Sequence, residues 1–250
     1  MDIISIPHLS PSSLLDLCHC PKLFELKRVK GIREPKTGRM LLGKAFHATL
    51  AFGYKYKLSY GEEVTAKDLL DFARSYWERE ASEPVQWQKD KPEELLPAML
   101  RLLALYREKV MPNYTPVAIE ERHEINIGEI PYLGYIDLIV QPKKIIDHKV
   151  RKVRFNQKTA DNDIQLTSYG LLLGEPVDCE FHVALLQKSP DIQIVSTKRS
   201  SGNYAFLKDM ALRAWRLVNS AREFVPNPSW WGCREPDEEN SGCFYWSFCH

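Results

Sequence analysis

The spacing of apolar residues divides the chain into two parts. In residues 9–110 apolar side chains recur every three or four positions, the period at which they line one face of an α-helix. The repeat is clearest in 43–58, 66–80 and 92–110, and Pro21 predicts a break between two helices near the start. We therefore predict that the first part of the chain is mainly helical.

Beyond residue 116 the apolar runs become short and rich in residues that favour strands. They predict strands at 117–127, 132–140, 144–150, 180–188 and 192–198, and helices at 159–174 and 205–225. A helix that connects strands, with further helices to cover them, is typical of the α/β class. We expect one domain over residues 1–250, with a mainly helical part (1–115), a sheet core (116–200) and a helix with a cysteine-rich tail (201–250).

Composition places the chain among ordinary soluble globular proteins, with 44% hydrophobic and 27% charged residues. No apolar run approaches the ~20 residues that are needed to span a bilayer. The first ten residues lack the basic start and the long apolar stretch of a signal peptide. We therefore expect a cytoplasmic protein with no membrane partner.

Positive charge is unevenly distributed along the chain, although the net charge is only +1. Residues 22–44 contain eight lysines and arginines against two glutamates, and residues 143–158 contain seven against one aspartate. Either run alone is typical of a solvated face, but two such runs beside a candidate site favour a groove that faces phosphates.

Two acids and a lysine stand in the segment that most favours strands. Asp137 interrupts the apolar run 135–140, and Asp147 ends Ile145-Ile146-Asp147, with Lys149 two positions further on. Asp137 alone would be a charge at the end of a surface strand. On adjacent strands, however, the two carboxylates can face the same side and bind Mg²⁺ or Mn²⁺ through oxygen. Lys149 would project to that side too, because strand side chains alternate, whereas His148 should point to the opposite side and not act as a ligand. This set suits metal-assisted hydrolysis of a phosphodiester, in which the lysine holds or deprotonates a water.

Several motifs resemble those of a known family, the RecB-like branch of the PD-(D/E)XK nuclease superfamily. The core of that branch resembles "GYIDLIV" (134–140) followed by "IIDHKV" (145–150), and its upstream helix resembles "GKAFHATL" (43–50). Its later helix motif resembles "QLTSY" (165–169), and its opening resembles the segment 9–26. The resemblance implies a restriction-endonuclease-like fold, a mixed central sheet flanked by helices, with a helical N-terminal insertion and a C-terminal cysteine-rich tail.

The resemblance also implies a role for each matching residue. His47, Asp137 and Asp147 would be direct metal ligands, with the backbone carbonyl of Val150 as a fourth, and Lys149 would position or activate the attacking water. Gln165 and Tyr169, one helical turn apart, would hold DNA or the surroundings of the site. A glutamate of the preceding strand would assist, and Glu120, Glu121 and Glu124 are equal candidates for that role.

Cysteines cluster near the two ends of the chain. Cys233, Cys243 and Cys249 lie in the last eighteen residues, and Cys18 and Cys20 near the start, whereas Cys179 should lie in the core. In a reducing compartment such clusters favour metal or cluster binding over disulfides. The resemblance to the iron–sulfur members of the branch, the CRISPR adaptation nucleases and the AddB subunits, implies a [4Fe-4S] cluster. Its ligands would be Cys20, Cys233, Cys243 and Cys249, with Cys18 as a rival for the first position and zinc as the alternative cofactor. The nine residues between Cys233 and Cys243 are more than the branch usually has.

Together these patterns predict a metal-dependent DNA nuclease, an exonuclease on single-stranded ends in preference to a site-specific endonuclease. The alternatives are a catalytically idle DNA-binding or scaffolding subunit with a structural cluster, and a zinc protein that acts on something other than nucleic acid. The sequence has no phosphate-binding loop of a motor, so unwinding would need a helicase partner, in recombination or CRISPR adaptation. Oligomers are compatible with the resemblance. Four tryptophans could stack on bases, but we expect them to lie in the core: Trp77, Trp87, Trp230 and Trp231.

Overall fold

The fold consists of one sheet and two groups of helices, described by a computed structural model for residues 6–221, 223–236 and 242–249. The helices are α1 (Pro11–His19), α2 (Pro21–Phe24), α3 (Gly38–Tyr60), α4 (Ala66–Ala81), α5 (Pro92–Lys109), α6 (Gln157–Asp161), α7 (Ile164–Leu173) and α8 (Ser201–Ser220), with short segments η1 (Glu25–Val29), η2 (Met111–Asn113) and η3 (Trp246–Phe248). The strands are β1 (Thr115–Ile127), β2 (Ile130–Gln141), β3 (Lys144–Arg151), β4 (Val177–Leu185) and β5 (Asp191–Arg199).

The five strands follow one another in the sheet in the order β1-β2-β3-β4-β5. All neighbours are antiparallel except β3 and β4, which are parallel and are joined by a crossover through α6 and α7. This confirms the predicted mixed sheet. Strands β2 and β3 pair over only three positions, from Leu138↔Ile146 to Val140↔Lys144. The two strands therefore separate just before Asp137 and Asp147, and this separation makes room for the site.

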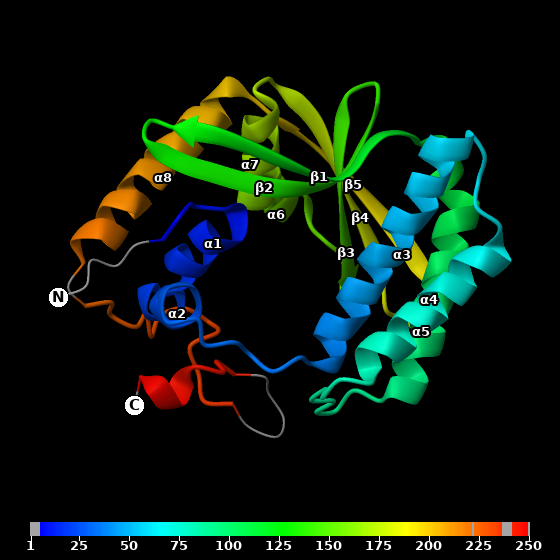
Figure 1. Cartoon of the computed structure of the whole chain (residues 1–250), viewed down its shortest axis with the longest axis horizontal. Coiled ribbons are helices and arrows are strands. Elements are labelled where there is room, and N and C mark those ends of the chain that lie inside the picture. The colour runs from blue at the N-terminus through cyan, green and yellow to red at the C-terminus, as the bar shows by residue number, and fades with distance from the viewer. Residues whose placement is uncertain (1–5, 222, 237–241, 250) are drawn as a thin grey trace.

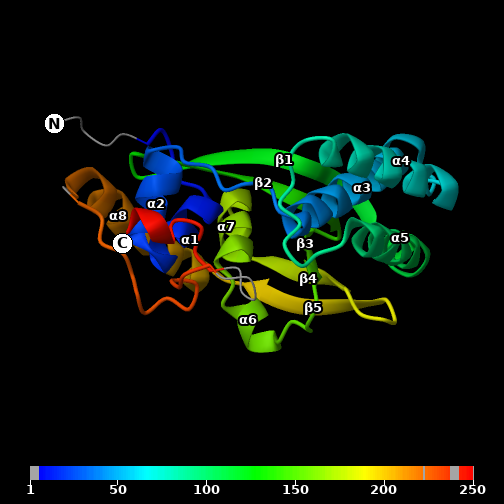
Figure 2. The ribbon, with the colours of Figure 1, turned by 90° about the horizontal axis from the view of Figure 1, so that it is seen from below.

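Two groups of helices cover the sheet from its two sides (Figure 1), and both views keep them apart (Figure 2). Helices α1, α7 and α8 pack around one apolar core, which includes Tyr132, Ile145 and Phe181. Helices α3, α4 and α5 pack around a second core, which includes Phe46 and Ile146. Because adjacent residues of β3 enter different cores, this strand is buried on both faces, which explains its almost continuous apolar run.

Local sequence signals set most helix ends. One predicted helix differs from the structure. Thr65 begins α4, since its side chain accepts the backbone N–H of Asp68 at 3.1 Å. The single helix predicted over 159–174 is wrong, because the structure has two helices, α6 and α7. Asp163 starts the second one by accepting the N–H of Leu166 at 2.8 Å, so the chain turns there.

The N-terminal helices pack against the C-terminal tail (Figure 1). The backbone N–H of Asn227 donates to the sulfur of Cys20 at 3.3 Å, and its side chain donates to the carbonyl of His19 at 2.9 Å. The Tyr245 hydroxyl donates to the carbonyl of Ile32 at 2.8 Å. In the part of the chain that the structure describes, no helix has the length and apolar character to cross a membrane.

Candidate active site

Strand β3 and helix α7 together present four polar side chains in contact. Asp147 and Lys149 project to the same face of β3, and the Lys149 Nζ lies 2.6 Å from the Asp147 Oδ2. The same ammonium donates to the Gln165 Oε1 at 2.9 Å, and the Gln165 Nε2 donates to the Tyr169 Oη at 2.6 Å. The structure thus brings Gln165 and Tyr169 to Lys149, where the sequence places them.

Asp147 is the most unusual acid of the protein. Its side chain is fully buried, and neither of its oxygens accepts a hydrogen bond of normal geometry from the described residues. Burial raises the pKa of Asp147 to about 6, with Lys149 opposing the shift and Asp137 adding to it. The Lys149 ammonium beside Oδ2 compensates this buried charge in part, whereas Oδ1 has no hydrogen-bond partner among the described residues. The carboxylate therefore fits a divalent metal ion beside Lys149.

Asp137 lies where β2 leaves β3, and it is anchored by two histidines. Its Oδ2 lies 3.2 Å from the His47 Nδ1 and accepts the backbone N–H of His148 at 3.1 Å. Burial would raise the pKa of Asp137, but the hydrogen bond with His47 and the charges of the two rings hold it at about 2. Asp137 is therefore an ionised acceptor that is available to a metal.

The ring of His148 lies on the α3 and α5 side of the sheet, away from Asp147, as strand alternation predicts. It nevertheless approaches the site, because its Nδ1 is 3.8 Å from the Asp137 Oδ2. One ligand atom each of His47, Asp137 and His148 lie within 4.8 Å of one another, a group that could hold a metal ion. His148 is therefore a candidate ligand by its position, and the expectation that it does not act as one stays a prediction.

A break in the alternation of β2 explains this approach. Ile136 and Ile139 pack in the first core, whereas Leu138 and Val140 pack in the second. Strict alternation would place residues 136 and 138 on the same face, so the strand twists next to Asp137. As a result Asp137 can be reached from both sides of the sheet.

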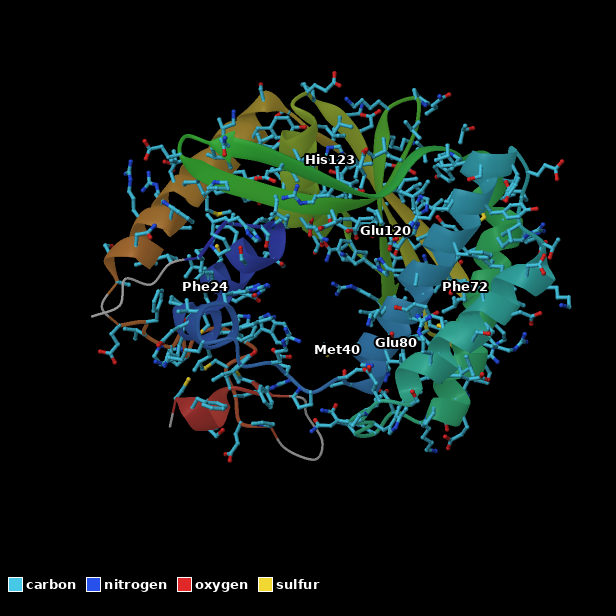
Figure 3. The ribbon with its side chains drawn as sticks, viewed as in Figure 1. Phe24, Met40, Phe72, Glu80, Glu120 and His123 are labelled. Atoms are coloured by element: carbon cyan, nitrogen blue, oxygen red, sulfur yellow. The ribbon has the colours of Figure 1, made fainter. Side chains whose placement is uncertain are left out.

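A small cavity of about 10 Å³ lies between these groups, enough for roughly one water-sized species. It is lined by His47, Ala51, Tyr54, Ile119, Glu120, Asp137 and His148. Of the three candidate glutamates, Glu120 is the one that lines it, with a backbone φ of 50° (Figure 3). Glu121 and Glu124 form ion pairs with His123 and Arg122 on the same strand.

Val150 lies near the end of β3, opposite Ala184 of β4, and its side chain packs against the second core. The role of its carbonyl as a ligand stays a prediction.

The terminal cysteines form a second cluster of candidate ligands. Cys20 is 5% exposed and shares a small apolar core with Tyr245, Cys243 and Cys249. Burial raises the pKa of Cys243, and the charges of Cys233, Cys249 and Cys20 raise it further. All four thiols are therefore close enough to influence one another.

Cys18 and Cys179 lie outside this cluster. Cys18 is exposed on α1, and Cys179 is buried in the first core as predicted.

The tryptophans divide between core and surface. Trp77 is buried in the second core, and Trp87 and Trp230 are partly buried. Trp231 is 77% exposed, so its predicted place in the core is wrong. It borders a cavity of about 390 Å³ beside the cysteine cluster.

The first basic run is largely neutralised by acids. Seven of its eight cations form ion pairs, and their partners are Asp16, Glu25, Glu80, Glu83 and Asp90. Lys152 of the second run lines a groove of about 450 Å³ together with Arg39 and Arg101. Asp90, Glu93 and Glu94 also line this groove and Asp90 pairs with Arg39, so Lys152 and Arg101 are its candidates for phosphate contacts.

The mixed sheet, its helices and the acid, acid and lysine arrangement define a nuclease of the restriction-endonuclease-like class. The sequence matches the model of the PD-(D/E)XK nuclease superfamily over residues 8–250, and the chain belongs to this superfamily.

One solved structure supports the fold. A protein from Eubacterium rectale described as a putative exonuclease aligns with a TM-score of 0.60 and 16% identity, over 92% of this chain and 91% of that one. The structure named SSO0001 aligns over 77% of this chain and 81% of that one, at 18% identity, but its TM-score of 0.32 carries no argument. The search of curated proteins finds no match.

Proposed function

We propose that this chain is a metal-dependent deoxyribonuclease that hydrolyses phosphodiester bonds and works from single-stranded ends. Membership of the superfamily indicates a nuclease, and the fully buried carboxylate of Asp147, paired with Lys149, is the observation that carries the proposal. A site without catalysis would have no physical reason to keep such an acid. The neighbour described as an exonuclease supports action from ends.

The metal would be Mg²⁺ or Mn²⁺, held by His47, Asp137 and Asp147 with the carbonyl of Val150. When bound, such an ion would polarise the phosphate and lower the pKa of the attacking water. Carboxylate oxygens suit both metals, and the Asp147 Oδ1 has no hydrogen-bond partner among the described residues.

Lys149 would orient the attacking water and offset the negative charge that develops on the phosphate. Its ammonium is fixed between Asp147 and Gln165, and the hydrogen bond from Gln165 to Tyr169 fixes that amide in turn. This packing preorganises the charge, which is the main way in which a site stabilises a transition state. Phosphates leading to the site would lie in the groove lined by Lys152 and Arg101.

The test is degradation of end-labelled single-stranded DNA in the presence of Mn²⁺. Asp147→Ala and Lys149→Ala should each lower the rate by about 10²-fold or more, the usual effect of losing a proton-transfer group. Asp178→Ala is the matched control, because Asp178 pairs with Lys198 on the exposed side of β4 and β5. Rates in both site variants equal to that of the control would refute the proposal. Circular single-stranded DNA should resist the wild type, and its cleavage would argue against action from ends.

The same assay separates the alternative of an idle scaffolding subunit. Tight binding of DNA that stays intact with both Mg²⁺ and Mn²⁺ would favour that subunit. A helicase partner that unwinds DNA for the nuclease is likewise part of the proposed function.

We further propose that Cys20, Cys233, Cys243 and Cys249 hold a [4Fe-4S] cluster. The proximity of the four thiols supports it. The cluster would tie the N-terminal helices to the tail and so restrain a long loop. Anaerobic purification tests this, because about four irons per chain and visible absorbance are expected, whereas a colourless protein with one zinc would contradict it.

A further inference from the structure

A chain of buried hydrogen bonds runs behind the site, from β4 through α5 to β3. The His182 Nε2 lies 3.2 Å from the Glu180 Oε2, and the His182 Nδ1 lies 2.6 Å from the Tyr106 Oη. The same Tyr106 oxygen lies 3.0 Å from the His148 Nε2. All four residues are at most 6% exposed, and the Tyr106 oxygen also lies 3.1 Å from the Tyr54 hydroxyl. Such a buried polar chain requires an explanation.

The geometry fixes where each proton lies along this chain. The Glu180 carboxylate already accepts from Lys144 and from the Tyr114 hydroxyl, so it is an acceptor for His182 as well. His182 therefore carries its proton on Nε2, and its Nδ1 accepts the Tyr106 hydroxyl proton. A phenol has only one proton to donate, so the Tyr106 oxygen must accept from the Nε2–H of His148.

The other nitrogen of His148 is consequently a free lone pair that faces the site. Its Nδ1 is 3.8 Å from the Asp137 Oδ2, too far for a hydrogen bond, so a proton at this position would have no acceptor there. His148 also lines the small cavity that it shares with His47, Asp137 and Glu120. The lone pair therefore faces the Asp137 carboxylate and the His47 imidazole across a cavity about the size of one ion.

We infer that His148 is a metal ligand through Nδ1, held in that tautomer by Tyr106, His182 and Glu180. This inference rests on the proposed function and deepens it. Histidine ligands generally donate their second N–H to a fixed partner, which sets the ring orientation. Asp147 is not among the atoms that gather within 4.8 Å, so His148 would complete the ion's shell on the side away from Asp147.

The test measures Mn²⁺ binding to the full chain by calorimetry and counts coordinated nitrogens by pulsed electron paramagnetic resonance. Wild type should show two histidine nitrogens, and His148→Gln should show one. Tyr106→Phe should weaken Mn²⁺ binding by about tenfold or more, because it removes the acceptor that fixes the tautomer. Tyr132→Phe is the matched control, since Tyr132 is equally buried and its hydroxyl lies 2.6 Å from the Ser168 Oγ in the first core, away from the chain of hydrogen bonds.

The outcomes separate this inference from the proposed function. If wild type binds Mn²⁺ with one histidine nitrogen, and both His148→Gln and Tyr106→Phe keep its affinity, only the role of His148 is overturned. If wild type binds no Mn²⁺ or Mg²⁺, the proposed nuclease function itself fails. Circular dichroism of each variant, with the half-buried His123→Gln as a further control, excludes misfolding as the cause of lost binding.

Discussion

Glu180 offers the sharpest test of how this structure is stabilised. Its carboxylate is 6% exposed and receives the Lys144 ammonium, the Tyr114 hydroxyl at 2.8 Å, the Ser196 hydroxyl at 3.3 Å and the His182 ring. Burial would raise its pKa, but the hydrogen bonds from His182, Lys144 and Tyr114 lower it from 4.5 to about 2. That shift corresponds to about 3 kcal/mol of folding free energy at neutral pH.

The pH dependence follows from the sign of this shift. The pKa is lower in the folded state, so the contribution is fully present above pH 4.5 and is lost as the pH falls towards 2. Urea unfolding followed by circular dichroism should find Glu180→Gln about 2 to 3 kcal/mol less stable than wild type at pH 7. The difference between the two proteins should shrink by about half or more at pH 3.

Glu175→Gln is the matched control, because Glu175 pairs with Lys143 at the surface, where 55% of its side chain is exposed. Exposed pairs contribute about 0.5 kcal/mol on average, so this variant should be close to wild type at every pH. Equal losses for the two variants, or a Glu180→Gln loss that is the same at pH 3 as at pH 7, would refute the reasoning.

Three further predictions concern other parts of the chain. Cys20→Ala should lower the iron content and the melting temperature, whereas Cys18→Ala should change neither, because only Cys20 lies among the tail thiols; iron per chain and a thermal melt decide. Leu103→Ala should cost about 2 to 5 kcal/mol in urea unfolding, because this side chain is fully buried, while Leu58→Ala, at a 49% exposed position, should cost far less. Thr65→Ala should cost about 1 kcal/mol, since its hydroxyl group accepts an N–H at the start of α4, and an unchanged unfolding midpoint would contradict that role.

The elements and the catalytic strand could be predicted because their signals are local. Alternation alone places Asp147 and Lys149 on one face, and helical spacing brings Gln165 and Tyr169 together. The motif at residues 145–150 is continuous in sequence, so no distant contact is needed to interpret it.

The chain of hydrogen bonds behind the site could not be predicted, because its members come from α5, β3 and β4. Glu180 and His182 alternate with apolar residues in β4, a pattern that normally marks a solvated strand face. The helices α3 to α5 cover this face instead, and Tyr106 of α5 supplies the partner. The first basic run did not predict a phosphate-facing surface for a similar reason. Lys36 and Lys44 pair with Glu80, which lies in α4 and is distant in sequence.

The contact of α1 and α2 with the tail has a consequence for biosynthesis. Cys20 leaves the ribosome early, but its neighbours Asn227 and Cys249 follow more than 200 residues later. The sheet and both large cores can therefore assemble on the nascent polypeptide before the other three thiols of the cluster have been synthesised. Delivery of an inorganic cofactor to the four sulfurs would accordingly be a post-translational event, and an interrupted synthesis would leave a folded but cofactor-free product.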